Sequence, residues 1–440
     1  MKRAGGLVIL PALVILLIGP SRATAAELDI DLSSEVGAEH TRETDIFTET
    51  AADASLSWIL SPDSDIEIAG GYSYRYDEGA AESEGEFIPA LDRARYFARV
   101  PISAAGGGTV AELTAGRFGL RDTTGLVVDT PADGLSVGIV APVVTFRVQS
   151  AYTGFLFRDS TDVRLTTGDL LDEDNLFGPT HLLGRAELAF PELLGRQSII
   201  VDAVGHLDLP ELPSSELDST DGADGLYGSL TLTGPLSRRV FYTLYGIGRA
   251  SRYFADSDDS GETYSTLAAA AGASLRAFAP ELAMSRAELQ LGWAGGERDF
   301  SRFSPTESGT ARHFAPITAP SLLRFTPLLL SNVAFAKLDY SLQPVDIGAG
   351  PREGLRTAVS VAAAYRPVEG AGTVAGLPSD AETGYVGTEI GTTLEIRPFS
   401  DLRFAIEGDM FFPSDLVKNA GLVENTDPHG QLLARIELSL

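Results

Sequence analysis

The chain has 440 residues, of which 44% are hydrophobic, and its 33 basic against 61 acidic side chains give a formal net charge of −28. So acidic a balance argues against nucleic acid or an anionic membrane surface as a partner. Cysteine is absent, which excludes disulfides, thiolate metal sites and thiol nucleophiles. The ordinary hydrophobic fraction and a mean hydropathy of +0.07 exclude a disordered acidic chain.

The first 25 residues have the pattern of a secretory signal peptide. A basic start is followed by an apolar run, Leu7 to Gly19, and by the small-residue cleavage motif Ala23-Thr24-Ala25. We therefore expect residues 1–25 to be removed on export and residues 26–440 to form one folded unit. Loss of the three basic residues in the leader takes the formal charge from −28 to −31. No later stretch is apolar over about 18 residues, so no transmembrane helix is expected.

The rest of the chain alternates between strand-like segments and connections rich in Gly, Pro, Asp and Ser. The segments, of about ten residues, alternate in hydrophobicity with the period of two that is typical of a β-strand. Short and long connections alternate between them. The short ones, which indicate tight turns, are residues 61–65, 103–109, 141–143, 191–197, 234–239, 279–283, 344–354 and 398–401. The long ones are residues 40–53, 77–91, 121–133, 158–180, 208–224, 255–262, 296–330, 366–382 and 414–429.

This alternation is typical of an outer-membrane barrel, which has short periplasmic turns and longer outer loops. A soluble sandwich has no reason to place every long connection at one end. Eight short and nine long connections predict an all-β, antiparallel up-and-down barrel of about 18 strands, with both termini on the short-turn side. About 16 strands would follow if residues 113–139 were a loop folded inward.

The faces of the expected strands support a barrel with a wet lumen. In residues 92–102, Tyr96 and Val100 share one face, and Arg95 and Arg99 share the other. An unpaired charge that faces hydrocarbon at mid-depth costs roughly 2 to 4 kcal/mol, so the charged face is expected to line water. Aromatic residues near strand ends fit the two bilayer interfaces; they are Trp58, Tyr72, Tyr74, Tyr76, Phe190, Trp293 and Tyr365.

The last ten residues, Gln431 to Leu440, form an alternating strand that lacks the Pro or Lys that usually blunts an exposed edge. We expect it to pair with the first strand, around Leu28 to Ser33, because closure removes both edges. In this pattern the chain resembles bacterial outer-membrane β-barrels of the porin type. The resemblance implies a location in the bacterial outer membrane, contact with its lipid and insertion by the assembly machinery. Leu440 departs from the aromatic residue, usually Phe, that is common at the end of such chains.

Charged residues on the inward faces are the candidate pore lining. The basic ones are Arg93, Arg95, Arg99, Arg147, Arg185, Arg286, Arg356, Arg403 and Arg435, and the acidic ones are Glu67, Glu187, Glu288, Asp339, Glu389, Glu407 and Glu437. Opposite charges across a pore would set a transverse field that sorts solutes by charge and size. The alternative is that these residues form structural ion pairs in a closed lumen. A barrel of about 18 strands is too wide for side chains alone to fill, so either a channel remains or a loop plugs it.

Two long connections are candidate constrictions. Residues 304–330 are too apolar to lie free in water, with Phe314, Ile317 and Leu322 among their large side chains. We expect this segment to fold into the barrel mouth or to pack on a neighbouring subunit, and removal of residues 304–325 to raise the conductance. Residues 121–133 are the alternative constriction.

Little else in the sequence indicates chemistry. The five histidines have no metal-ligand spacing, and His181 and His313 read as ordinary surface residues. No nucleophile-elbow motif occurs, although Ser, His and Asp could still assemble from distant strands. Asp256 to Glu262 has the oxygen density of a cation site but lacks the EF-hand spacing, so a solvated loop is expected. We expect neither an enzyme nor a bound metal or cofactor.

The sequence therefore predicts a passive channel for small hydrophilic solutes, either monomeric or a homo-oligomer. Two alternatives stay open. An adhesive or structural surface protein would combine acidic outer loops with a closed lumen. A transporter of a hydrophobic or polymeric substrate would use the apolar segment as a greasy pocket and open sideways between strands.

Overall fold

The computed structural model describes most of the chain. The described residues are 25–40, 44–77, 85–102, 108–158, 161, 163, 176–209, 222–255, 262–297, 310–318, 322–324, 326, 328–346, 354–369, 383–419 and 427–439. Residues 1–24 lie outside these ranges, so the signal peptide stays a prediction. The acidic stretch that ends at Glu262 lies outside them as well, apart from Glu262 itself.

Nearly all regular structure in the described ranges is β-strand. The strands are β1 (Ala25–His40), β2 (Thr44–Ser61), β3 (Ser64–Asp77), β4 (Gly85–Pro101), β5 (Val110–Arg121), β6 (Asp129–Ala141), β7 (Val144–Tyr152), β8 (His181–Leu194), β9 (Gln197–Asp208), β10 (Gly222–Pro235), β11 (Val240–Ala255), β12 (Glu262–Ala279), β13 (Ser285–Ala294), β14 (Thr310–Ala311), β15 (Val333–Asp346), β16 (Gly354–Arg366), β17 (Gly384–Phe399), β18 (Leu402–Pro413) and β19 (His429–Ser439). One short helix, α3 (Asp415–Asn419), follows β18. No helix in the described ranges is long and apolar enough to cross a membrane.

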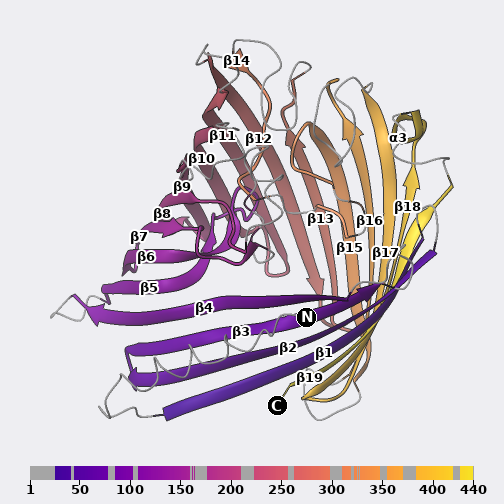
Figure 1. Cartoon of the computed structure of the whole chain (residues 1–440), viewed down its shortest axis with the longest axis horizontal. Coiled ribbons are helices and arrows are strands. Elements are labelled where there is room, and N and C mark those ends of the chain that lie inside the picture. Colours follow the sequence, from indigo (N-terminus) through magenta and orange to yellow (C-terminus); the bar gives the residue numbers. More distant parts are fainter. Residues whose placement is uncertain are drawn as a thin grey trace.

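The strands form a closed antiparallel barrel (Figure 1). Each strand pairs with the next in the chain, except that β13 pairs with β15 because β14, two residues long, lies parallel to β12. The last strand pairs back with the first from Asp31↔Ser439 to His40↔Gly430, which confirms the predicted closure. Without β14, eighteen of the nineteen strands make the wall. The 16-strand alternative was wrong, because β5 and β6 both belong to the wall.

The short turns are confirmed where the structure describes them, whereas residues 103–107 and 347–353 lie outside the described ranges. Four predicted long loops were wrong in extent. β6 begins at Asp129, inside the predicted loop 121–133, and β10 begins at Gly222, inside the predicted loop 208–224. β2 begins at Thr44, inside the predicted loop 40–53, and β4 begins at Gly85, inside the predicted loop 77–91. Polar residues such as Glu49 sit in β2 opposite β1. A wet lumen tolerates charged residues in a strand, so composition alone does not separate these strand ends from loops.

The outer wall carries the apolar face of the strands. Leu32, Leu432 and Ile436 are 41%, 58% and 49% exposed. Large apolar side chains of the other strands are exposed as well. An exposed band of this kind suits the hydrocarbon of a bilayer and would be costly in water. Tyr72 and Trp293, two of the predicted interfacial aromatics, are also exposed on this wall.

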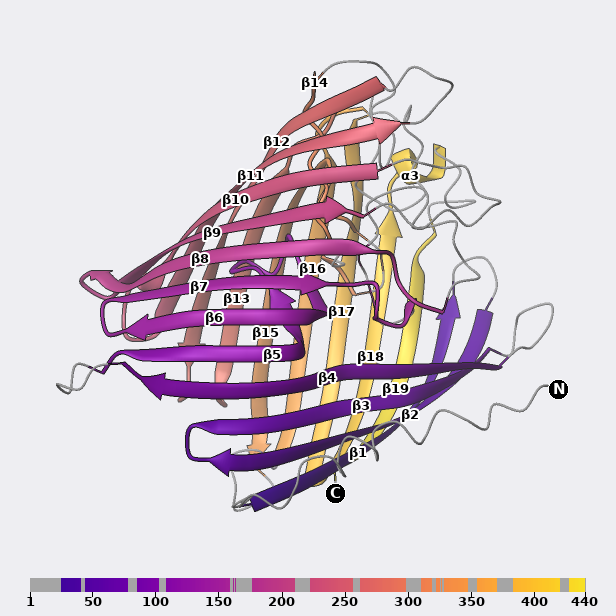
Figure 2. The ribbon, with the colours of Figure 1, turned by 60° about the vertical axis from the view of Figure 1, so that its left-hand side comes forward.

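Two connections turn inward and give the barrel a packed interior (Figure 2). We call residues 121–129 the inner hairpin and the described residues of 312–332 the inner strap. They meet where the backbone N–H groups of Ile317 and Thr318 donate to the Val127 carbonyl, at 2.8 and 3.1 Å. The predicted folding of the apolar segment into the barrel is confirmed for its described residues, whereas residues 304–309 lie outside the described ranges. Both candidate constrictions contribute to it.

Candidate functional site

Charged side chains from β3 to β9 form a run of ion pairs along the inner wall. Glu67 accepts hydrogen bonds from Arg93 and, at 2.9 Å, from Arg95. Glu112 lies between Arg99, at 2.6 Å, and Arg147, at 3.1 Å. Because each of these carboxylates pairs with arginines on nearby strands, each charge is partly compensated by a neighbour on the same wall.

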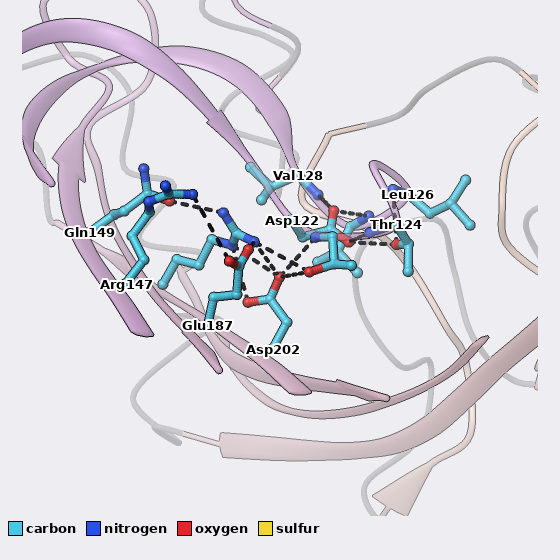
Figure 3. A network of polar contacts seen from close by, with 11 residues as sticks. Asp122, Thr124, Leu126, Val128, Arg147, Gln149, Glu187 and Asp202 are labelled. Atoms are coloured by element: carbon cyan, nitrogen blue, oxygen red, sulfur yellow. Dashed lines mark hydrogen bonds and ion pairs between the residues drawn. The ribbon is translucent and has the colours of Figure 1, made fainter. Parts of the chain in front are cut away.

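This run ends at a buried hub under the inner hairpin (Figure 3). The Arg185 side chain, 7% exposed, bonds to Asp202 at 2.8 Å and also pairs with Glu187. Asp202 in turn accepts the backbone N–H and the hydroxyl of Thr123, at 2.8 and 2.9 Å. The hub therefore joins the hairpin to β8 and β9 by charge-assisted bonds, which are stronger than neutral ones.

A second carboxylate gives the inner hairpin its shape. Asp122, 3% exposed, accepts the N–H groups of Val127 and Val128 at 3.0 and 2.9 Å, and that of Thr124 at 2.8 Å. A buried carboxylate that accepts several backbone N–H groups stabilises a tight turn. The hairpin is thus a preorganised part of the lumen, which suits a fixed constriction.

Ion pairs also follow the wall from β12 round to β1. Arg276 and Arg286 both pair with Glu288. Further on, Arg403 bridges Glu395 at 3.0 Å and Glu437 at 2.8 Å, and Arg435 bonds to Glu35 at 2.6 Å across the closing strands.

The inner strap is held to β10 and β11 by a buried cation and a tyrosine. The Arg249 guanidinium, 2% exposed, donates to the His313 carbonyl at 3.2 Å and lies 5.6 Å from the ring centre of Tyr227. The Tyr227 hydroxyl donates to the Ala315 carbonyl at 2.6 Å. Burial, aided by the charge of Arg249, lowers the pKa of His313 to about 3, so this histidine is neutral when the strap is in place.

At its far end the strap is held through its main chain. Glu389 on β17, 4% exposed, accepts the backbone N–H of Arg324 and that of Thr326, both at 2.8 Å. The Arg324 guanidinium then reaches the lumen wall, where it donates to Thr393 at 2.7 Å and lies 3.8 Å from Glu407. The strap therefore adds a positive charge to the lumen.

A cavity of about 220 Å³ opens beside this contact. Its charged lining comprises Arg286, Glu288, Arg324, Asp339 and Arg356, with Gln290, Ser341 and Ser360 among the neutral groups. Within the described residues, no hydrogen bond or ion pair engages the exposed Arg356 side chain. This leaves a cationic donor available to a solute.

The predicted pore-lining residues fall into different parts of the lumen: two runs of ion pairs, the cavity lining and the anchor of the inner strap. Arg93, Arg95, Arg99, Arg147, Arg185 and Glu187 belong to the β3–β9 run, and Arg403 and Arg435 to the run near the closing strands. Arg286, Arg356 and Glu288 line the cavity, with Glu407 close to Arg324. Glu389 is taken up by the strap backbone. Whether these residues sort solutes stays a prediction.

Sequence reasoning missed the residues that fix the inward segments. Asp122, Asp202, Arg249 and Arg324 have no local motif, and only their contacts with distant segments distinguish them. The interpretation of His181 and His313 as surface residues was wrong: they are 0% and 1% exposed, His181 at the start of β8 in the wall and His313 in the inner strap. No cluster of three potential metal ligands occurs among the described residues.

Known proteins share this fold but little sequence. No protein family and no curated protein matches the chain. Among solved structures, it is similar to OccK7 (OpdD) of Pseudomonas aeruginosa, with 12% identity, 95% of this chain and 99% of that chain covered, and a TM-score of 0.54. It is also similar to OccK5 (OpdH) of the same organism, with 11% identity, 94% of this chain and 98% of that chain covered, and a TM-score of 0.52.

A third similar structure is OpdK of Pseudomonas aeruginosa, described as an outer membrane protein, with 12% identity, 94% and 98% coverage and a TM-score of 0.50. OpdK has also been solved with vanillate. At such identities the likeness establishes the fold alone. The class is a closed 18-stranded β-barrel of the outer-membrane type, with a charged lumen narrowed by two inward segments.

Proposed function

We propose that this protein is a passive channel in a bacterial outer membrane for small hydrophilic solutes. The observation that supports the proposal most directly is the charged cavity beside Arg324 and Arg356, inside a wall whose outer face is apolar. A lumen lined by both charges orders water and selects solutes by charge and size. No step of catalysis is proposed.

The finer part of the proposal concerns selectivity. An anionic group is favoured at Arg356, because this guanidinium lacks a described carboxylate partner and lies beside Arg286 and Arg324. Glu288 already pairs with two arginines, so it does not cancel the local positive potential. The vanillate of the OpdK structure is a carboxylate of the size that such a cavity suits.

Planar-bilayer recordings of refolded residues 26–440 in a salt gradient test this function. Stable conductance steps are expected, with a reversal potential of the sign that anion preference requires. A folded barrel that never conducts would contradict the channel and favour the surface-protein alternative, whereas a cation-selective channel would contradict only the role given to Arg356.

A further inference from the structure

The barrel wall has a seam where β5 leaves β4. The two strands pair only from Ala94↔Arg117 to Pro101↔Val110. The earlier part of β4, from Gly85 to Leu91, pairs with β3 along one edge. Along its other edge no described strand pairs with it. Figure 2 shows β4 running on well past the end of β5.

A glycine makes this departure possible. Gly116 has a φ of +108°, and a Cβ atom there would lie 2.2 Å from the Ala94 carbonyl oxygen. The backbone of β5 passes so close to β4 only without a side chain, and beyond it the chain bends into the lumen. Phe118 and Leu120, which follow, are 5% and 0% exposed inside the barrel.

One side chain spans the seam in place of backbone pairing. The Arg117 guanidinium donates to the Leu91 carbonyl on β4 at 3.0 Å and to the Phe155 carbonyl at 2.8 Å. It also forms an ion pair with Asp133 on β6 at 2.6 Å, and its side chain is 6% exposed. A single arginine therefore joins β4 to the segment after β7.

The register places this ion pair in the lipid-facing wall. Side chains an even number of residues apart in a strand point to the same face. Arg117 lies four residues from the exposed Leu113, and Asp133 two residues from the exposed Leu135, so both belong to the outward-facing positions of their strands. From Val110 to Arg117 the strand rises about 18 Å, at about 3.3 Å per residue and a tilt of roughly 40°, against an apolar band about 25 Å tall. The seam is thus at the depth of the outer leaflet, where an unpaired charge is costly and where the ion pair with Asp133 offsets part of that cost.

Both sides of the seam are apolar. On the outside, Phe155 is 65% exposed and Phe87 is 61% exposed. On the inside, Phe118, Leu120 and Val127 belong to the buried cluster around the inner hairpin. An apolar chain that crossed the seam would meet apolar groups on both faces, and the main polar obstacle is the Arg117–Asp133 pair.

We propose that this seam, bounded by Leu91, Arg117, Asp133 and Phe155, is a lateral opening through which a single-chain amphiphile passes between the lumen and the outer leaflet. A long-chain carboxylic acid has the right shape: its tail suits the aromatic margin. Opening requires the Arg117 bonds to break, and no row of backbone pairs between described residues has to separate. This inference is independent of ion conduction through the lumen.

The test uses a diazirine-labelled C16 fatty acid in phosphatidylcholine vesicles that contain the full mature chain. After photolysis, mass spectrometry locates the adducts. We expect adducts on lumen residues 118–128 in addition to the outer wall. The variant Arg117→Met/Asp133→Leu removes both charges together, so that no uncompensated charge is left, and should increase the lumen labelling several-fold.

A second variant distinguishes lateral entry from entry along the pore. The chain has no native cysteine, so Leu91→Cys/Phe155→Cys joined by a short bismaleimide closes the seam selectively, with each single variant as a reagent control. Loss of lumen labelling with unchanged labelling of residues 135–139 supports the opening. Lumen labelling that survives the cross-link, or labelling confined to the outer wall in every variant, would overturn it.

Discussion

Glu389 on β17 accepts the backbone N–H of Arg324 at 2.8 Å, so a carboxylate of the barrel wall holds the inner strap by its main chain. The same carboxylate accepts the N–H of Thr326 through its second oxygen. The position of the strap and the charge that it brings to the lumen therefore depend on different groups. Glu389 holds the strap backbone in place, and the Arg324 side chain stays available to the lumen.

Glu389→Gln should loosen the strap. The substitution keeps the shape but replaces charged acceptors by one neutral acceptor, and hydrogen bonds to charged groups contribute about 1.5 to 3 kcal/mol. We expect a higher mean conductance with more frequent transitions in single-channel recordings. Glu407→Gln is the matched control, since it removes the same charge near Arg324 without touching the strap backbone. Indistinguishable traces from the two variants would show that Glu389 has no anchoring role.

Arg356→Gln should weaken the anion preference. This guanidinium faces the cavity without a described partner, so its loss removes a charge that is not already compensated. The affinity of a small carboxylate that blocks the pore should fall roughly tenfold or more, and the reversal potential should move toward cation preference. Arg239→Gln, on an exposed turn outside the lumen, is the control. An unchanged reversal potential for Arg356→Gln would assign selectivity to other residues.

The sequence predicts the barrel because closure, alternation and connection length are properties of each strand and its neighbours in the chain. Leu32 and Ile436 could be assigned to the lipid face from a period of two alone. The site is different in kind. The inner hairpin and inner strap are held by Asp202 and Glu389, whose partners lie 79 and 65 residues away, at Thr123 and Arg324. No local pattern distinguishes these acids from the other carboxylates of the lumen face.

Acidification should release the inner strap. His313 is neutral in place, with its pKa lowered to about 3 by burial, and has an ordinary pKa of about 6.5 once the strap is free in water. Between these values the released state binds more protons, so strap stability falls as pH falls, by at most about 1.4 kcal/mol per pH unit. We expect the open probability to rise below about pH 6 and to be flat above it.

The variant His313→Asn isolates this effect, because asparagine does not titrate and can still bond to Ser331, the partner of His313 Nε2 at 2.9 Å. Its open probability should lose most of the rise on acidification. If the variant and the native chain respond alike, the pH dependence originates in the lumen carboxylates.

Gly116→Ala tests the bend that forms both the constriction and the seam. A Cβ atom at this position meets the Ala94 carbonyl at 2.2 Å, and the φ of +108° is unfavourable for any L-residue. Strain of this kind costs about 1 to 3 kcal/mol, before the clash is counted. We expect a smaller folded fraction after refolding, read as heat-modifiable mobility on a gel. Gly119→Ala is the control three residues on, where nothing lies within 4 Å of the added carbon. Equal folded fractions would mean that β5 can leave β4 without a glycine. In that case Arg117, rather than the backbone at Gly116, would determine where the wall parts.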